Sequence, residues 1–245
     1  MVRLIRYLSS CGIDSRRKCE LIIRSGRISI NGEKETNPFR ILSKKDSIDF
    51  DGRSILPPNN RTTLVLNKPA GIITTAKDTH DRKTVLDIIP KTNRRLFPIG
   101  RLDKETTGIL LLTDDGDLAY CLTHPKFAIE KTYEAEVDRQ LTYSEIKLIT
   151  SGVDIGSQEI GRALVIRQTL VKGKIIISLR LHHGKKREIR RIFKVIGLNL
   201  HSLHRVTFAG INLGNLPIGD SRQLTDKEYN FLNNIDLSKV QKGKA

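Results

Sequence analysis

Residues 100–116 read GRLDKETTGILLLTDDG, and this stretch decides how the rest of the chain is interpreted. Its first half is charged and rich in turn-forming residues. Residues 108–113, in contrast, form the short, continuous apolar run that is typical of a strand buried on both faces. The DDG at residues 114–116 supplies the turn chemistry that ends such a strand. The sequence therefore predicts a core strand over 108–113, with Asp103 on the loop that leads into it.

Asp103 lies between the cations Arg101 and Lys104. A carboxylate held on a rigid loop among cations should stay ionised, which suits a nucleophile and not a general acid. Thr106 and Thr107 are expected to hydrogen-bond nearby backbone and so to hold the shape of the loop. On local sequence alone, the more frequent role of such an Asp is to close an Asx-type turn without doing chemistry.

The composition indicates a folded protein with a polyanionic partner. The chain has 245 residues, of which 38% are hydrophobic, enough for one large domain or for a small and a medium one. Lys and Arg number 43 against 27 acidic residues, which gives a formal charge of +16. Because no basic helix adjoins an anchoring signal, nucleic acid is favoured over a membrane as the partner.

The first residues have too short an apolar run, broken at Gly12, to be expected to act as a signal peptide, and no apolar segment approaches the length of a membrane span. The chain is therefore expected to be soluble and cytoplasmic. Its three cysteines, Cys11, Cys19 and Cys121, form no CxxC pair and have no His at ligand spacing. They are interpreted as reduced, ordinary residues, and no metal site or disulfide framework is expected.

The first 60 residues predict a small basic module. A helix starts near Leu4 and stops at Gly12, a second starts at about Asp14 or Ser15 and runs to Ser25 with Gly26 as its stop, and Asn31-Gly32 is a strong hairpin signal. The segments RLIRYLSSCGIDSRRKCELIIRSGRISING and DSIDFDGR resemble the S4 RNA-binding domain. The resemblance implies that four basic residues face RNA phosphates: Arg16, Arg17, Lys18 and Arg27. We expect this domain over residues 1–60, with a linker at about 55–62.

The remaining chain alternates strands with a few helices. Thr142 with Glu145, and Thr225 with Glu228, form capping boxes for two of these helices. The other predicted segments are strands at 64–66, 131–137, 163–170 and 174–181, and helices at 85–89 and 117–122. Residues 238–245 are interpreted as a frayed basic tail.

Residues 184–197, GKKREIRRIFKVIG, predict an amphipathic basic helix that stops at Gly197. On a helical wheel, Lys186 and Arg190 border its apolar stripe. The other three basic residues point away from the stripe and should meet only solvent or RNA: Arg187, Arg191 and Lys194. Residues 180–205 hold eight Lys or Arg and one acidic residue, which favours a nucleic-acid groove over an ordinary solvated face.

Taken together, the motifs are similar to those of the RsuA/RluB family of ribosomal RNA pseudouridine synthases. The motifs are LNKPAGIIT, GRLDKETTGILLLTDDG, THPK followed by EKTY, and HHGKKREIRRIFKVIG with LHRVTFAGI. The resemblance covers nearly the whole chain and implies an α+β architecture. It implies a small S4-type α/β domain followed, over residues 63–240, by a pseudouridine synthase domain with a mixed, mainly antiparallel sheet flanked by helices. A basic tail at 241–245 would follow.

The resemblance implies roles for residues as well. Asp103 would be the nucleophile, Tyr133 the aromatic residue against the target base, and Arg190 the cation that neutralises Asp103. Arg101 and Leu102 would shape the same loop. Lys186, Arg187 and Arg191 would contact RNA.

In this family uracil is released from its ribose, turned and rejoined through C5, without cofactor or metal. The implied partner is 16S or 23S ribosomal RNA, or a ribosomal subunit precursor, bound by a monomer. The central motif resembles the small-subunit branch slightly more than the large-subunit branches.

Two other hypotheses remain. The chain could be an RNA-binding or ribosome-assembly protein that keeps the fold but not the chemistry. The combination of Asp103, Tyr133 and Arg190 argues against that reading, because a binding protein does not need all three. A DNA-binding regulator built on the first helix pair would leave the other three quarters of the chain unexplained.

Overall fold

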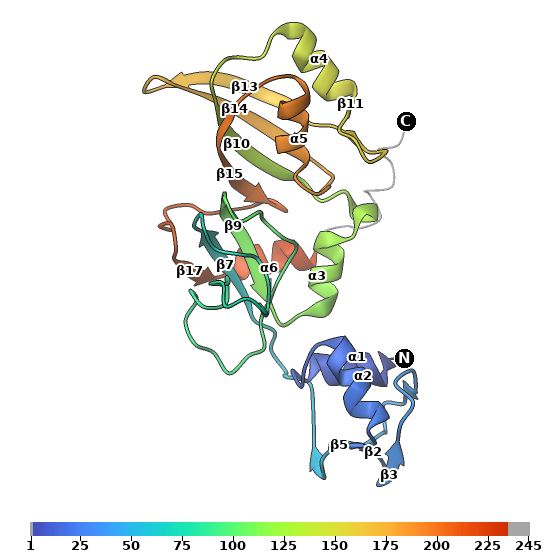
Figure 1. Cartoon of the computed structure of the whole chain (residues 1–245). Helices are drawn as coiled ribbons and strands as arrows, with labels where there is room; N and C mark the ends of the chain where they lie inside the picture. The colour runs from blue at the N-terminus through green and yellow to red at the C-terminus, as the bar shows by residue number, and fades with distance from the viewer. Residues whose placement is uncertain (1, 235–245) are drawn as a thin grey trace. The chain divides into compact units, whose positions relative to one another are not determined.

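The computed structural model describes residues 2–234 of the chain, in two compact units (Figure 1). Of the described residues, the first unit comprises 2–62, 91–96 and 113–116, and the second comprises 63–90, 97–112 and 117–234. The basic tail predicted at 241–245, and the last residues of the domain predicted over 63–240, lie outside the described residues.

The first unit packs two short helices against small sheets. In the sheets, β1 pairs with β4, and a four-stranded sheet has the order β3-β2-β5-β6. Its elements are β1 (Val2–Arg3), α1 (Leu4–Ser10), α2 (Arg16–Arg24), β2 (Ile28–Ile30), β3 (Glu33–Glu35), β4 (Ile41–Leu42), β5 (Ile48–Phe50) and β6 (Arg53–Ser54).

Local sequence explains the turns of this unit. The Ser15 side chain accepts the N–H of Lys18 and so caps the start of α2. Asn31 and Gly32 both have positive φ, as a two-residue hairpin turn between β2 and β3 requires. The core is aliphatic, and its fully buried members include Leu4, Leu8, Cys19 and Ile23. The predicted helix pair and hairpin are thus present.

The second unit is built on a nine-stranded mixed sheet. The strands run in the order β13-β14-β10-β15-β9-β7-β17, with β16 added to β15 and β8 to β9. Their bounds are β7 (Thr63–Lys68), β8 (Phe97–Pro98), β9 (Thr106–Thr113), β10 (Lys131–Val137), β13 (Leu164–Val171), β14 (Lys174–Leu181), β15 (Leu200–Phe208), β16 (Ile211–Asn212) and β17 (Ser221–Gln223). The short strands β11 (Val153–Asp154) and β12 (Ile160–Gly161) form a separate pair.

Helices flank this sheet, so the expected α+β class is confirmed (Figure 1). They are α3 (Gly116–Thr123), α4 (Tyr143–Ser151), α5 (Glu188–Val195) and α6 (Asp226–Asn233), with a 3₁₀ turn at Pro125–Phe127. Both predicted capping boxes are formed, at Thr142 with Glu145 and at Thr225 with Glu228. Each box supplies partners for orphan N–H groups at a helix start.

Two apolar clusters divide the core of this unit. One combines β10, β14, β15, α4 and α5, and the other combines β7, β9, α3 and α6. They meet where β15 runs parallel to β9, with Arg205 paired to Gly108. Gly108 has a φ of 103°, and a Cβ there would lie 2.3 Å from the Arg205 carbonyl oxygen. A side chain at residue 108 would therefore separate the two strands that join the halves of the sheet.

The helix predicted at residues 85–89 is wrong, because this segment is a turn. Asp87 accepts hydrogen bonds from both the N–H and the hydroxyl of Thr84, at 2.7 and 2.8 Å. These bonds offer the backbone an alternative to helical pairing, and Pro90 follows immediately.

The helix predicted over 184–197 is shorter than expected, because α5 begins only at Glu188. Arg187 stands before it with a left-handed φ of 53°.

Candidate active site

Asp103 lies on a loop of the second unit that is held by hydrogen bonds on both sides of this residue. The Thr74 hydroxyl donates to the Leu102 carbonyl at 2.8 Å and accepts from the Leu102 N–H at 3.3 Å. The Thr106 N–H donates to the Asp103 carbonyl at 3.0 Å, where the loop enters β9. Leu102 itself is buried. These contacts hold the backbone on both sides of Asp103.

The side chains of Thr106 and Thr107 were expected to hold this loop, and they do not. Both residues belong to β9, so their side chains reach neighbouring elements. Thr107 Oγ1 lies 2.8 Å from Nδ1 of His204, and Thr106 Oγ1 accepts a bond of 3.4 Å from Nη2 of Arg190.

Lys68, at the end of β7, lies fully buried beneath the loop. Its Nζ donates to three backbone carbonyls, those of Pro69 at 2.9 Å, Lys104 at 3.0 Å and Thr106 at 3.0 Å. Burial lowers the pKa of Lys68 to about 8, although the nearby carboxylates of Glu105 and Asp103 act in the opposite direction. A buried ammonium group is therefore part of the support on which Asp103 rests.

Two arginines approach the Asp103 carboxylate. Arg190 Nε, on α5, lies 3.6 Å from Oδ2 of Asp103, and Arg187 Nη1 lies 3.8 Å from the same oxygen. Both distances are too long for good hydrogen bonds, so the interaction is one of charge. The Arg190 side chain is 18% exposed and that of Arg187 is 52% exposed. The buried Nε of Arg190 has no hydrogen-bond partner among the described residues.

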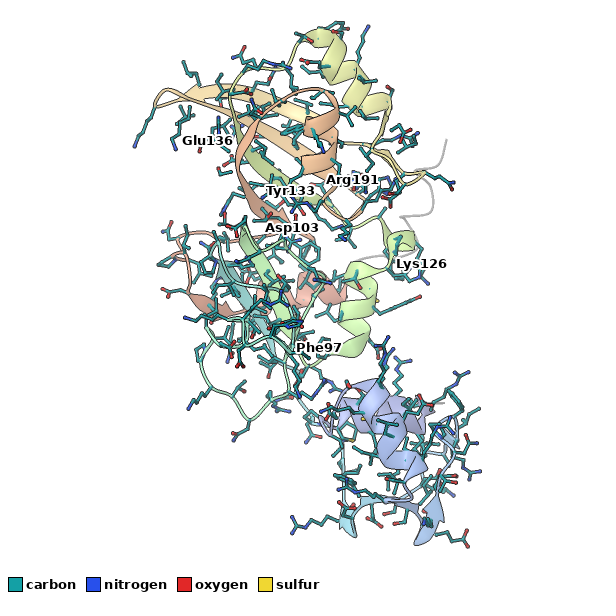
Figure 2. All side chains as sticks on the ribbon, viewed as in Figure 1. Phe97, Asp103, Lys126, Tyr133, Glu136 and Arg191 are labelled. Atoms are coloured by element: carbon teal, nitrogen blue, oxygen red, sulfur yellow. The ribbon has the colours of Figure 1, made fainter. Side chains whose placement is uncertain are left out.

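The Asp103 side chain opens onto a cavity of about 340 Å³ between the two apolar clusters. Tyr133 on β10 lines the same cavity, and Figure 2 shows Tyr133 and Asp103 near one another. Tyr133 pairs across the sheet with Arg205 of β15, so the two side chains share one face. The sequence-predicted trio of Asp103, Tyr133 and Arg190 is thus brought together around one space.

The cavity wall is strongly basic. Its charged lining consists of two acidic residues, Asp103 and Glu188, and six basic ones, Arg101, Lys131, Lys185, Arg187, Arg190 and Arg205. Burial, with a further contribution from Arg205, lowers the pKa of Lys131 to about 8, while Glu188 opposes the shift. Such a lining favours a polyanionic ligand.

Two residues expected to contact RNA lie outside this cavity. Lys186 is exposed and is absent from the lining. Arg191 was expected to point to solvent or RNA, and this is wrong. Its guanidinium donates to the carbonyls of Ile155 at 2.8 Å and Gly156 at 2.6 Å and pairs with Glu159. The expectation failed because a helical wheel considers one helix alone, and the turn between β11 and β12 packs beside α5.

Arg187 was also expected to point away from the apolar stripe and to meet only solvent or RNA, and it lies within 4 Å of Asp103 instead. The cause is the left-handed backbone of Arg187 just before α5. Because Arg187 is not helical, a helical wheel does not give the direction of its side chain. Arg101 is exposed at the rim of the cavity, and Leu102 lines the cavity while anchoring the loop.

In the first unit, the four predicted RNA-contact residues differ in their partners. Arg16 and Arg17 are exposed on α2 and form no ion pair within residues 2–234. Lys18 pairs with Asp14 at 3.0 Å. Arg27 pairs with Asp51 and lies over the ring of Phe50.

Sequence reasoning missed four residues of this site, namely Lys68, Thr74, Lys131 and Arg205. Lys68 and Lys131 do stand in the quoted motifs LNKPAGIIT and EKTY, and Arg205 stands in LHRVTFAGI. Nothing local distinguishes them from surface lysines and arginines, because their burial depends on strands that are far apart in the sequence.

Among the described residues, no group of three or more His, Cys, Asp or Glu is placed to hold a metal ion. No helix in that part of the chain combines the length and apolar character that crossing a membrane would require.

The fold and this site place the chain in a known class. Residues 62–194 match the RNA pseudouridylate synthase family, and residues 2–48 match the S4 domain. The chain belongs to the RNA pseudouridylate synthase family, which makes it a pseudouridine synthase with an S4 domain in front.

Individual relatives agree along nearly the whole chain. It is 35% identical over 234 residues to the ribosomal large subunit pseudouridine synthase B of Bacillus subtilis, covering 95% of this chain and 96% of the relative. It is 31% identical to the dual-specificity RNA pseudouridine synthase RluF of Salmonella typhi, over 99% of this chain and 81% of that protein. A crystal structure of a pseudouridylate synthase superposes with a TM-score of 0.66 at 25% identity, covering 95% of this chain and all of that one.

Proposed function

We propose that this protein converts a uridine of ribosomal RNA to pseudouridine, with Asp103 as the nucleophile. The observation that carries the proposal is the carboxylate of Asp103, which faces a basic cavity with Arg190 and Arg187 within 4 Å. A carboxylate that is covered by a substrate would take up a proton unless a cation were buried with it. Arg190 supplies that cation and does not deprotonate.

The target base must leave its stack to reach Asp103. Extruding a nucleotide costs a few kcal/mol, which phosphate contacts and stacking can offset. In this proposal Tyr133 packs against the extruded uracil, while Arg187 and Arg101 meet the backbone at the rim. Arg16 and Arg17 on the S4 domain add phosphate contacts elsewhere on the RNA.

Ribosomal RNA is the proposed substrate because the Bacillus subtilis relative is named for the large ribosomal subunit. The name of that relative is an argument for 23S RNA as the substrate of this chain. It goes against the slight resemblance of the central motif to the small-subunit branch, which would indicate 16S RNA. The monomeric state and the cytoplasmic location remain predictions of the sequence.

The test is to map pseudouridines in 16S and 23S RNA from cells with and without the gene. We expect one or more sites to disappear on deletion and to return with the wild-type gene. Asp103→Asn should not restore them. Asp220→Asn is the matched control, because Asp220 is an exposed carboxylate outside the cavity, and it should restore them fully.

If no site changes on deletion, ribosomal RNA is not the substrate. If Asp103→Asn restores the sites, the carboxylate is not the nucleophile.

A further inference from the structure

Arg205 is a buried cation in the lining of the active-site cavity. Only 2% of the residue is exposed, yet it belongs to the cavity lining. Its Nε–H donates to the Ile109 carbonyl at 2.8 Å, and its guanidinium lies 4.6 Å from the Phe208 ring centroid. Its Nη2 has no hydrogen-bond partner, and no carboxylate pairs with it, among residues 2–234.

A buried guanidinium without a carboxylate partner is costly, and a substrate that supplies a hydrogen-bond acceptor would reduce this cost. Leaving a buried charged donor unpaired costs more than leaving a neutral one. Its backbone cannot shift to find another partner, because β15 is held against Gly108 of β9 on one side and against Tyr133 of β10 on the other. The donor is therefore fixed in place before any ligand enters.

The depth of Arg205 indicates which part of a nucleotide it meets. The Arg187 side chain is 52% exposed and so can be reached by the RNA backbone, whereas Arg205 of the same cavity lining is only 2% exposed. Tyr133 is its direct cross-strand neighbour on the same face of the sheet. If Tyr133 packs against the face of an extruded uracil, the donor beside it lies at the edge of that base.

We propose that Arg205 donates a hydrogen bond from its guanidinium group to a carbonyl oxygen of the extruded uracil and stabilises the negative charge that this base acquires. When the C1′–N1 bond breaks, its electron pair leaves with uracil and is delocalised over N1, O2 and O4. A guanidinium fixed at either oxygen favours that state over the neutral nucleoside. The new C1′–C5 bond then forms, C5 loses its proton and N1 gains one, so the isomerisation is balanced without a co-reactant.

Arg205 would thus act on the departing base, whereas Arg190 acts on Asp103 and Arg187 on the RNA backbone. This inference rests on the proposed function, because it needs a uridine substrate. It adds a group for which the family assignment gives no role.

The test uses the full-length protein and a short RNA that carries the uridine identified by mapping. The RNA is made with uridine, 2-thiouridine or 4-thiouridine at that one position, since sulfur accepts hydrogen bonds more weakly than oxygen. Single-turnover rates of the wild type, Arg205→Met and Arg205→Lys are measured, and thermal midpoints report on folding. Arg180→Met is the control, because Arg180 is a β14 arginine outside the cavity that pairs with Glu130.

We expect Arg205→Met to lower the rate with uridine on the order of 100-fold, the effect of removing one fixed donor from a developing negative charge. The wild type should lose rate with one of the thio substrates, and that position names the oxygen. Arg205→Met should show no such additional loss, because the contact is already gone. Arg205→Lys should recover part of the rate, and Arg180→Met should behave as the wild type.

Equal thio effects in the wild type and in Arg205→Met would overturn the inference while leaving the proposed function intact. The inference would also be overturned if neither thio substitution changed the rate of the wild type. This measurement does not depend on the folding of any variant. A wild type inactive on the uridine RNA would remove the proposed function and this inference with it.

Discussion

Replacing Lys68 by Met should reduce activity far more than stability. The ammonium group donates to the carbonyls of Pro69, Lys104 and Thr106, and so holds the Asp103 loop from below. Without it the loop can shift, and a displacement of about 1 Å at a reacting group can cost on the order of 100-fold in rate. We therefore expect a loss of that size in single-turnover pseudouridine formation.

The change in stability should be small because two effects oppose each other. Of the three carbonyls that lose their donor, only that of Thr106 is bonded at a fully buried contact, and one buried carbonyl without a donor costs about 1–3 kcal/mol. Against this, the pKa of Lys68 falls from 10.5 to about 8, so burying the charged form costs about 3 kcal/mol at neutral pH. Met removes that cost, so the two effects nearly cancel and the free energy of unfolding should change by no more than about 2 kcal/mol.

The same pKa shift predicts a pH dependence with a definite sign. Between about pH 8 and 10.5, the unfolded chain keeps the Lys68 proton and the folded chain has lost it. Stability then rises with pH, and the wild type should gain about 2 kcal/mol relative to Lys68→Met between pH 7 and 9.5. Lys131 has a similarly lowered pKa but is present in both proteins, so its contribution cancels in the difference.

Denaturant unfolding at the two pH values measures this gain, with Lys104→Met as a control that removes an exposed ammonium from the same loop. A constant difference between wild type and Lys68→Met at both pH values would refute the buried-charge argument. Wild-type turnover by Lys68→Met would refute the support of the loop.

Arg190→Gln should lower the single-turnover rate by roughly 10- to 1,000-fold, because charges 3.6 Å apart interact by about 1–5 kcal/mol between water-like and surface-like dielectric. Arg190→Lys should lose less, and equal rates for Gln and wild type would exclude the ion pair. Replacing Arg16 and Arg17 together by Gln should weaken RNA binding and reduce the salt slope of log K by about 1.5. A slope that stays the same would exclude phosphate contacts by this pair. Gly108→Ala should destabilise the fold by several kcal/mol in denaturant unfolding, because a Cβ there lies 2.3 Å from the backbone of β15. Wild-type stability would show that the two strands can separate without cost.

The parts of the fold that the sequence predicted are those set by local patterns. The apolar run at 108–113 lies within the buried strand β9, and the boxes at Thr142 and Thr225 begin α4 and α6. Asp103 was placed correctly on the loop before β9, because its position depends only on where that strand begins.

The parts that were missed depend on residues distant in the sequence. The direction of Arg187 is not that of a helical residue, because its backbone is left-handed. Arg191 donates hydrogen bonds to carbonyls that are more than 30 residues away in the sequence. Lys68 is buried by carbonyls from the Asp103 loop, and Arg205 by the pairing of β15 with β9 and β10. A lysine or arginine in a short motif carries no local sign of such burial.

The most direct test of the central claim is to compare purified wild type and Asp103→Asn on the same ribosomal RNA. Binding and single-turnover pseudouridine formation are measured side by side. Asn keeps the size of the side chain but removes the charge, so binding should stay within a few-fold of wild type while pseudouridine formation is lost. Pseudouridine formation by Asp103→Asn at the wild-type rate would contradict the account.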